Sequence, residues 1–291
     1  MLWGFLAVFL KVALDYEDPI TLAWFRFCIA FIVLTIVLSI RNKKKLKILK
    51  NPPRVAILAA IALGGNYVTY IMGIDKTSPS NAQVFIQIGP VVLVLASIFI
   101  FKEKVTKAQL VGFLIAITGF VLFFFEQLNE IIFEDQENYK TGSFLIICSA
   151  ISWACFATLQ KSIAHKYDPQ SLNLIHFSIP SVMLFPFVDF TVFQDTSPMV
   201  WLLIIFLGVN TILAYGALAE SFQFIESNKI AVIIIINPII TITTMSVLSY
   251  FEFDFVEAEV ISIYGVLGAL LVISGAVLAV SRKSKNIEIE K

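Results

Sequence analysis

Long apolar stretches, separated by short polar segments, follow one another along almost the whole of this 291-residue chain. A transmembrane helix needs about 20 predominantly apolar residues. Ten stretches reach or approach this length, and the pattern predicts an all-α polytopic membrane protein with ten transmembrane helices. The predicted helices cover roughly residues 1–14, 20–40, 55–74, 79–101, 106–125, 142–163, 169–189, 199–221, 228–250 and 259–281.

Several of these helices have a recognisable start. At four places a side chain that can cap a helix precedes a proline, whose missing N–H costs nothing at the first helical position. These pairs are Asp18-Pro19, Ser78-Pro79, Asp168-Pro169 and Ser197-Pro198. In addition, Thr106 and Gln109 have the spacing of a capping box at the start of the fifth helix.

The charged residues predict how the helices are oriented. Segment 41–54 holds seven Lys and Arg residues, and the tail over 282–291 is also basic. The acidic segments 15–18, 126–141 and 252–259 fall on the other side of a ten-helix arrangement. Because Lys and Arg mark cytoplasmic loops, we expect both termini in the cytoplasm and an acidic extracytoplasmic loop over 126–141. The expected location is the plasma membrane, which in a bacterium is the inner membrane.

The amino-acid composition is that of a membrane protein, and it gives no sign of a nucleic-acid, metal or cofactor partner. The chain is 58% hydrophobic and 14% charged, whereas soluble domains contain about 25% charged residues. Its formal net charge of zero gives no indication of a nucleic-acid partner. The three cysteines (Cys28, Cys148 and Cys155) lie within apolar runs, without the spacing of a metal site. We therefore expect no metal and no cofactor.

The chain contains an internal repeat. Residues 3–19 and 153–169 share Trp, Ala, Lys, Asp and Pro at a constant offset of 150, and related matches continue to the last helix. The repeat predicts two units, over 1–125 and 142–281, each with five helices. Since five is odd, the second unit is expected to enter the membrane in the opposite orientation. The same offset predicts that the first helix begins upstream of Met1; the alternative is that this short helix enters the membrane incompletely.

An inverted repeat of this kind is typical of transporters that work by alternating access. Two pseudo-symmetric halves can rock about a central site and open it to each side in turn. Pro90 and Pro238 lie in the middle of equivalent helices, and each removes an intrahelical hydrogen bond. We predict that these kinked helices act as gates, although a static kink is an alternative.

Three motifs lead to a family resemblance. They are the W-x7-K-x6-DP pattern over 3–19, the segment GIDKTSPSNAQVFIQIGP over 73–90, and FKEKVTKAQLVGFLIAITGFVLF over 101–123. With them the chain resembles the EamA-type transporters of the drug/metabolite transporter superfamily. The resemblance implies ten helices and the export or exchange of small metabolites, often amino acids.

A substrate site is expected near the middle of the membrane, at the interface of the two halves. Counting about ten residues inward from the helix ends, at 1.5 Å per residue, reaches a set of polar and aromatic side chains. The set comprises Trp3, Asn66, Tyr67, Tyr70, Gln83, Gln87, Trp153, Asn210, Tyr215 and Asn237. They could hold a small amphipathic solute. Alternatively, the amide side chains simply bond neighbouring helices.

Two ionisable residues lie inside predicted helices at equivalent positions. Arg26 is expected to line the outer vestibule, where it could meet a substrate carboxylate; snorkelling to lipid headgroups is the alternative. His176 could titrate near neutral pH, or it could be a packed hydrogen-bonding group. Proton coupling therefore stays open at this stage.

The function predicted from the sequence is secondary transport by a monomer. A membrane-embedded enzyme is the first alternative, but the polar residues within the helices are mostly Asn, Gln, Ser and Thr, which are poor acid–base catalysts. A channel is the second, but the sequence has no ring of charge and no filter-like loop. The expected partners are a small-molecule substrate and the lipid bilayer.

Overall fold

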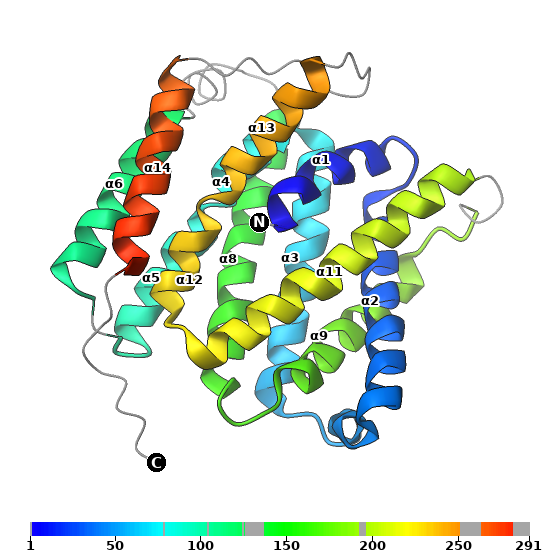
Figure 1. The fold of residues 1–291 in the computed structure, drawn as a ribbon. Helices are drawn as coiled ribbons and strands as arrows, with labels where there is room; N and C mark the ends of the chain where they lie inside the picture. The colour runs from blue at the N-terminus through cyan, green and yellow to red at the C-terminus, as the bar shows by residue number, and fades with distance from the viewer. Residues whose placement is uncertain are drawn as a thin grey trace.

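The computed structural model describes residues 2–77, 79–103, 105–123, 125, 137–191, 196–250 and 263–281. In these ranges the chain forms helices and short connections, without a β-strand. Figure 1 shows the helices side by side in one bundle, several of them strongly tilted.

The helices of the first half follow the predicted order. They are α1 (Leu2–Leu14), α2 (Pro19–Arg41), α3 (Arg54–Lys76), α4 (Pro79–Phe85), α5 (Ile88–Phe99) and α6 (Lys107–Phe123). The basic loop after α2 contains a short 3-10 helix, η1 (Lys43–Leu49), which the apolar pattern did not reveal because its residues are mostly lysines.

The helices of the second half also follow the predicted order. They are α8 (Glu137–Ile163), α9 (Pro169–Leu184), the 3-10 turn η2 (Phe185–Phe187), α11 (Pro198–Phe224), α12 (Ser227–Ile234), α13 (Asn237–Tyr250) and α14 (Ile263–Ser281). The start of the predicted helix over 259–281, and the tail over 282–291, lie outside the described residues.

Six helical stretches in the described ranges are long and apolar enough to cross a membrane. They are α2, α3, Ala82–Phe99, α8, α11 and Ser227–Met245. Shorter apolar helices are α1, α6 and Ile263–Ala279. The structure thus has the helices of a multi-pass membrane protein.

The predicted helix starts are confirmed wherever the structure describes them. Asp18 accepts hydrogen bonds from the backbone N–H groups of Ile20 and Thr21. Asp168 and Ser197 cap α9 and α11 in the same way. The capping box before α6 also forms. Ser78 lies outside the described residues.

Two predicted boundaries were wrong. The predicted loop over 126–141 is too long, because α8 already begins at Glu137; an acidic first turn suits the positive end of the helix dipole. The predicted helix over 169–189 ends early, at Leu184, and the chain continues as a 3-10 turn that contains Pro186. Pro186 has no N–H to donate to the carbonyl four residues earlier, so the α-helical hydrogen-bond pattern cannot continue through it.

The helices that contain Pro90 and Pro238 are each broken into two pieces. The first break separates α4 from α5 at residues 86–87, and the second separates α12 from α13 at residues 235–236. Each break lies just before its proline, because the ring cannot donate to the carbonyl four residues earlier. The kinks expected at Pro90 and Pro238 are therefore present, at equivalent positions of the two halves.

Glycines bring α6 and α14 into very close contact. A Cβ atom on Gly112 would lie 2.7 Å from the carbonyl oxygen of Gly275, and one on Gly119 would lie 2.8 Å from that of Gly268. No side chain fits at these distances, so the two backbones touch directly. Small residues commonly allow such close helix contacts in membranes.

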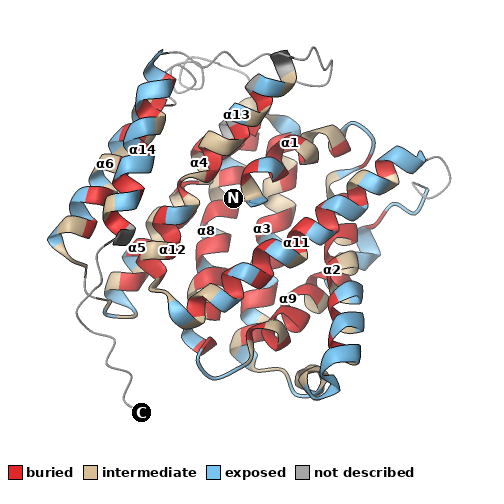
Figure 2. Ribbon diagram, viewed as in Figure 1, coloured by how far each residue is buried: buried red, intermediate tan, exposed pale blue. Residues whose placement is uncertain are grey.

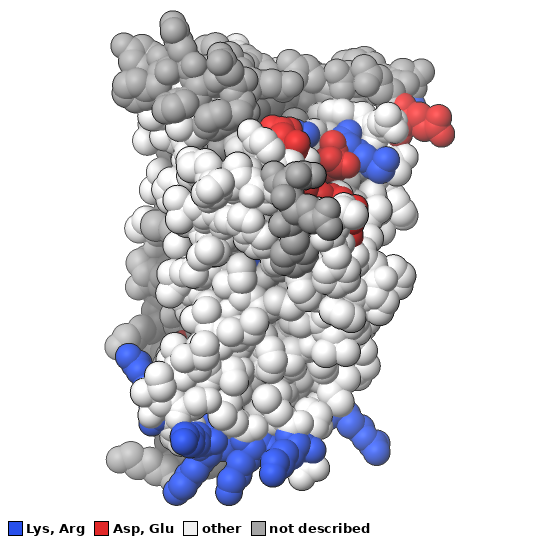
Figure 3. All heavy atoms as spheres, turned by 90° about the vertical axis from the view of Figure 1, so that its right-hand side faces the viewer, with Lys and Arg blue, Asp and Glu red and all other residues white. Residues whose placement is uncertain are grey.

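The surface of the bundle is apolar around its middle and charged at its ends. Figure 2 shows that the exposed residues of the helices face outward, while the buried residues face the other helices. In the view of Figure 3, Lys and Arg gather at one end and Asp and Glu appear near the other, with an uncharged band between them. Such a band matches the hydrocarbon layer of a bilayer.

Candidate functional site: a central cavity between the two halves

A cavity lies at the centre of the bundle, and helices from both halves of the chain line it. Its empty volume, including the mouth, is about 640 Å³, a size typical of small-molecule sites. Ten of the residues expected at the substrate site line it: Trp3, Arg26, Asn66, Tyr67, Tyr70, Gln83, Gln87, Trp153, Tyr215 and Asn237. The lining is completed by Leu6, Ile86, Pro90 and Ile234.

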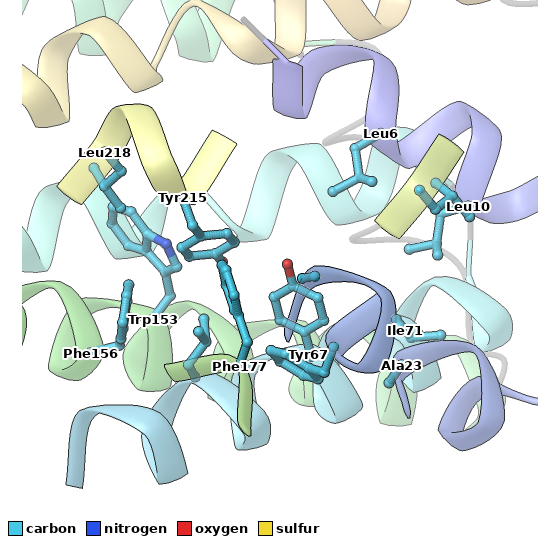
Figure 4. Close-up of a cluster of buried hydrophobic side chains, with 14 of the residues drawn as sticks. Leu6, Leu10, Ala23, Tyr67, Ile71, Trp153, Phe156, Phe177, Tyr215 and Leu218 are labelled. Carbon is cyan, nitrogen blue, oxygen red and sulfur yellow. The ribbon is translucent and has the colours of Figure 1, made fainter. Parts of the chain in front are cut away.

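Aromatic rings from the two halves meet at this cavity. The indole rings of Trp3 and Trp153 lie edge to face with their centres 6.1 Å apart, and the ring of Tyr215 lies 5.4 Å from that of Trp3. In Figure 4, the ring of Tyr215 lies between Trp153 on one side and Tyr67 on the other. Edge-to-face pairs at such distances are favourable, and they present flat apolar surface to a ligand.

Arg26 is buried inside the bundle and does not reach the headgroups. Only 2% of its surface is exposed, and its guanidinium carbon lies 4.4 Å from the centre of the Tyr67 ring. One nitrogen, Nη2, donates to the hydroxyl of Thr211 at 3.3 Å. Another, Nε, is buried without a partner among the described residues. The geometry agrees with a cavity-lining arginine and not with snorkelling.

A small hydrogen-bond network holds the groups beneath Arg26 in place. The Tyr67 hydroxyl donates to Thr211 at 3.3 Å, and Thr211 donates to the carbonyl of Leu207 at 2.9 Å. The Tyr67 ring also packs on Phe27, with centres 4.3 Å apart. Arg26 is thus supported by an aromatic face and a hydroxyl, both of which are uncharged.

The amide side chains at the cavity differ in what they contact. Asn66 donates to the carbonyl and the hydroxyl of Ser149, at 3.1 and 2.7 Å, and so joins α3 to α8. In contrast, the side-chain oxygens of Gln87 and Asn237 are buried without a partner in the described structure. Both of these residues lie at the helix breaks, where a ligand or a conformational change could satisfy them.

Two of the expected site residues do not line the cavity. His176 is fully buried, and its ring packs edge to face on Phe156 at 5.1 Å. Asn210 donates to the carbonyl of Leu2 at 3.1 Å and so joins α11 to α1. Both residues therefore contribute to helix packing, although His176 packs through its ring and neither of its nitrogens has a hydrogen-bond partner among the described residues. Pro238 is also absent from the lining, although Pro90 is part of it.

A cluster at the basic end was missed as a functional feature by the sequence reasoning. Lys161 donates to the carbonyls of Phe222 and Ile225, at 3.1 and 3.0 Å. Its Nζ lies 4.0 Å from Glu103, which also accepts from the backbone N–H of Ser227 at 3.1 Å. The cluster joins the connection between α5 and α6, from the first half, to α8, α11 and α12 of the second half.

Lys11 makes the equivalent contact at the other end of the bundle. Its Nζ lies 3.4 Å from the carbonyl oxygens of Ile74 and Thr77, at the end of α3. The repeat of Lys11 as Lys161 was the sequence signal that could have revealed both contacts, because a lysine suits the negative end of a helix.

The described residues contain no group of three or more His, Cys, Asp or Glu side chains that could hold a metal ion. The chemistry of the cavity is instead that of one cation, several amides and several aromatic rings. A bundle of apolar helices with such a cavity is the arrangement of a membrane transporter that binds a small solute.

Comparison with known proteins agrees with this class. The sequence model of the EamA-like transporter family matches residues 1–125 and 140–281, so the chain belongs to that family. It is 30% identical over 277 residues to the "Uncharacterized inner membrane transporter YhbE" of Escherichia coli K12, and the alignment covers 94% of this chain and 86% of that one. It is 28% identical to an "Uncharacterized transporter" of Haemophilus influenzae, with 96% and 91% of the two chains covered.

A solved structure shows that the fold is known. A protein described only as "Crystal structure of protein" superposes with a TM-score of 0.70, and 95% of each chain is covered. The two sequences are 17% identical, so this likeness concerns the fold alone.

Proposed function

We propose that this membrane transporter is a secondary transporter that exports or exchanges small metabolites, such as amino acids, by alternating access. In this proposal ten transmembrane helices form two inverted five-helix repeats around the central cavity. The broken helices α4–α5 and α12–α13 move as its gates. No chemical conversion of the solute is involved.

The observation that carries the proposal is the convergence of equivalent residues on one cavity. Trp3 and Trp153 stand 150 residues apart in the sequence, yet their rings meet. Tyr67 and Tyr215, which are also equivalent, both line the cavity and lie 5.9 Å apart. A ligand on a pseudo-symmetry axis can be approached from either side of the membrane with little change in its own contacts.

The contacts at the two ends of the bundle support alternating access. The cluster around Lys161 closes the basic end by joining the two halves. The equivalent position at the other end belongs to Lys11, whose hydrogen bonds among the described residues go to the end of α3, in its own half. Exchange between two such arrangements needs a few polar contacts to break at one end while others form at the opposite end.

The distribution of charge supports the proposed orientation. The 3-10 helix η1 contains four lysines, and the end of the bundle that carries it is therefore assigned to the cytoplasm. With ten spans both chain termini lie on that side, in the inner membrane of a bacterium. In this proposal the protein works as a monomer, because one chain carries both halves, and proton coupling is a further part of the proposal.

Counterflow in proteoliposomes tests the proposal. Vesicles loaded with a high concentration of one unlabelled amino acid or organic acid should accumulate the labelled compound transiently, and the initial rate should saturate. A variant that fills the cavity, Ile234→Trp, should abolish the flux. Ile36→Ala, on the exposed outer face of α2, serves as the matched control and should transport normally.

Two results would contradict the proposal. Flux that rises linearly with concentration and shows no counterflow would indicate a channel. Conversion of the solute to a new product would indicate an enzyme.

A further inference from the structure

Arg26 provides a positive charge that no acidic group in the described structure neutralises. The residue is 2% exposed and lines the central cavity. Its polar and cation–π contacts in the described structure are the uncharged hydroxyl of Thr211 and the face of the Tyr67 ring. None of the described cavity-lining residues is Asp or Glu.

A buried charge without a partner is costly. Within a membrane-embedded bundle, arginines normally pair with an acidic group, with backbone carbonyls or with water. The Tyr67 ring offsets part of the cost by a cation–π contact, and Thr211 accepts one of the five N–H groups that a guanidinium can donate. The remaining N–H groups are suited to an anion.

We propose that the solute carried by this protein is a small monocarboxylate with an apolar or aromatic body, and that Arg26 binds its carboxylate. This inference rests on the proposed function, and it adds to that function the charge of the solute and the residue that recognises it. A planar guanidinium can bind both oxygens of a carboxylate through two parallel hydrogen bonds.

The rest of the cavity specifies the body of the solute. Trp3, Trp153 and Tyr215 present aromatic surface, and Leu6 and Ile234 add aliphatic surface. These groups favour a ring or a branched chain by burial of apolar area. The head group must be small and singly charged, because Arg26 is the only cation among the described lining residues. A phosphate monoester carries nearly two charges at pH 7 and matches this site less well.

Matched ligands separate recognition of the carboxylate from recognition of the body. Equilibrium binding to the purified full-length protein can be followed by tryptophan fluorescence, since Trp3 and Trp153 line the cavity. The first set is 3-phenylpropanoate, 3-phenylpropanamide and 3-phenylpropylamine. The second set is phenylalanine and phenylalaninamide. In each set the body stays constant, and only the group offered to Arg26 changes.

In the wild-type protein the acid of each set should bind at least about tenfold more tightly than its amide, the difference expected for a charge-assisted pair. The amine should bind more weakly still, because it places like charges together. The inference is overturned if neither acid binds saturably, or if an amide or the amine binds as tightly as the acid. This comparison needs no variant, so it holds even if a substitution at Arg26 prevents folding.

Variants then assign the effect to Arg26. Arg26→Gln should remove the preference for the acid over the amide, whereas Arg26→Lys should keep part of it, because the charge remains but the planar fork is lost. Arg54→Gln, at the exposed start of α3, is the control and should bind like the wild type. Unchanged preference in a folded Arg26→Gln protein would overturn the assignment.

The two proposals can fail separately. If the acids bind as expected but show no counterflow, the secondary-transport function is wrong and the carboxylate site stands. If counterflow is found only with solutes that lack a carboxylate, the carboxylate site is wrong and the transport function stands.

Discussion

Lys11 and Lys161 occupy equivalent positions in the two halves of the sequence and bind equivalent carbonyl groups at opposite ends of the bundle. Lys11 reaches the carbonyls of Ile74 and Thr77 at the end of α3. Lys161 reaches two carbonyls with the same spacing at the end of α11. Figure 1 shows that α3 and α11 end on opposite sides of the molecule, so the repeated lysine makes the same kind of contact at the two ends of the bundle.

Under the proposed mechanism, removing Lys161 should open the cavity at the basic end of the bundle, the proposed cytoplasmic side. Lys161→Ala deletes two hydrogen bonds and the neighbour of Glu103, and the population should shift toward the state that is open to the cytoplasm. A cysteine placed in the cavity by Gln83→Cys, in a background without Cys28, Cys148 and Cys155, reports this shift. A membrane-impermeant maleimide should label it faster from the cytoplasmic side.

Lys11→Ala is the matched variant for this experiment. Its contacts lie within the first half, at the end of α3, so their removal should leave labelling from either side close to that of the wild type. If Lys11→Ala changes labelling as much as Lys161→Ala does, or if Lys161→Ala does not change it, the contact between Lys161 and Glu103 does not control access to the cavity.

Gly119→Ala should loosen the contact between α6 and α14. The new methyl group would lie 2.6 Å from the backbone nitrogen of Val272, and backbone atoms cannot move aside as a flexible side chain can. Overpacking of this kind costs about 1–3 kcal/mol, measurable as a lower thermal or denaturant midpoint in detergent. Gly216→Ala is the control, because its nearest neighbour is the Gln170 side chain at 3.7 Å. Equal stability of the two variants would contradict direct backbone contact.

The ion pair of Asp168 with Lys45 should make a pH-dependent contribution to stability at the basic end of the bundle. Partial burial raises the pKa of this carboxyl, but hydrogen bonds from Lys45 and Ser171 outweigh burial and hold the pKa below its ordinary value of 3.8. The Lys45 Nζ lies 2.6 Å from the carboxylate. Because the folded state favours the ionised form, the stabilisation is complete above pH 3.8 and is lost as the pH falls through the folded-state value.

Two substitutions separate the charge of Asp168 from its capping role. Asp168→Asn keeps an oxygen that can cap α9 and should cost less than about 1 kcal/mol, since the ion pair is about one-third exposed. Asp168→Ala also removes the cap and should cost about 1 kcal/mol more. The difference between wild type and Asp168→Asn, measured by denaturant unfolding, should shrink in acid. A difference that grows in acid would show that the sign is wrong.

His176→Phe should leave solute binding intact. The imidazole packs on Phe156 away from the cavity, and neither of its nitrogens has a partner in the described structure. An apolar ring in its place removes two unsatisfied buried groups, which is nearly neutral or stabilising. The pH profile of transport should also stay the same. A profile that flattens while the protein remains folded would instead give His176 a role in proton coupling.

Much of the cavity could be predicted because depth in a membrane can be counted along a helix. Trp3 and Trp153, Tyr67 and Tyr215, and Gln87 and Asn237 were placed at one level by residue number, and the structure brings them together. Counting residues does not show in which direction around the helix axis a side chain points. His176 and Asn210 were predicted on the same basis, but they point into neighbouring helices because packing, not depth, sets which face they occupy.

The sequence by itself determined the helices, their caps, the two proline breaks and the internal repeat, since each depends on neighbours within a few residues or on a direct comparison of segments. Tertiary structure alone decided which polar and charged side chains find a hydrogen-bonding or ionic partner. It paired Lys161 with the end of α11, used Asn66 for packing against α8, and left Arg26 without an acidic partner among the described residues. Such contacts join residues more than 60 positions apart, and their distances follow only from how the helices tilt and pack.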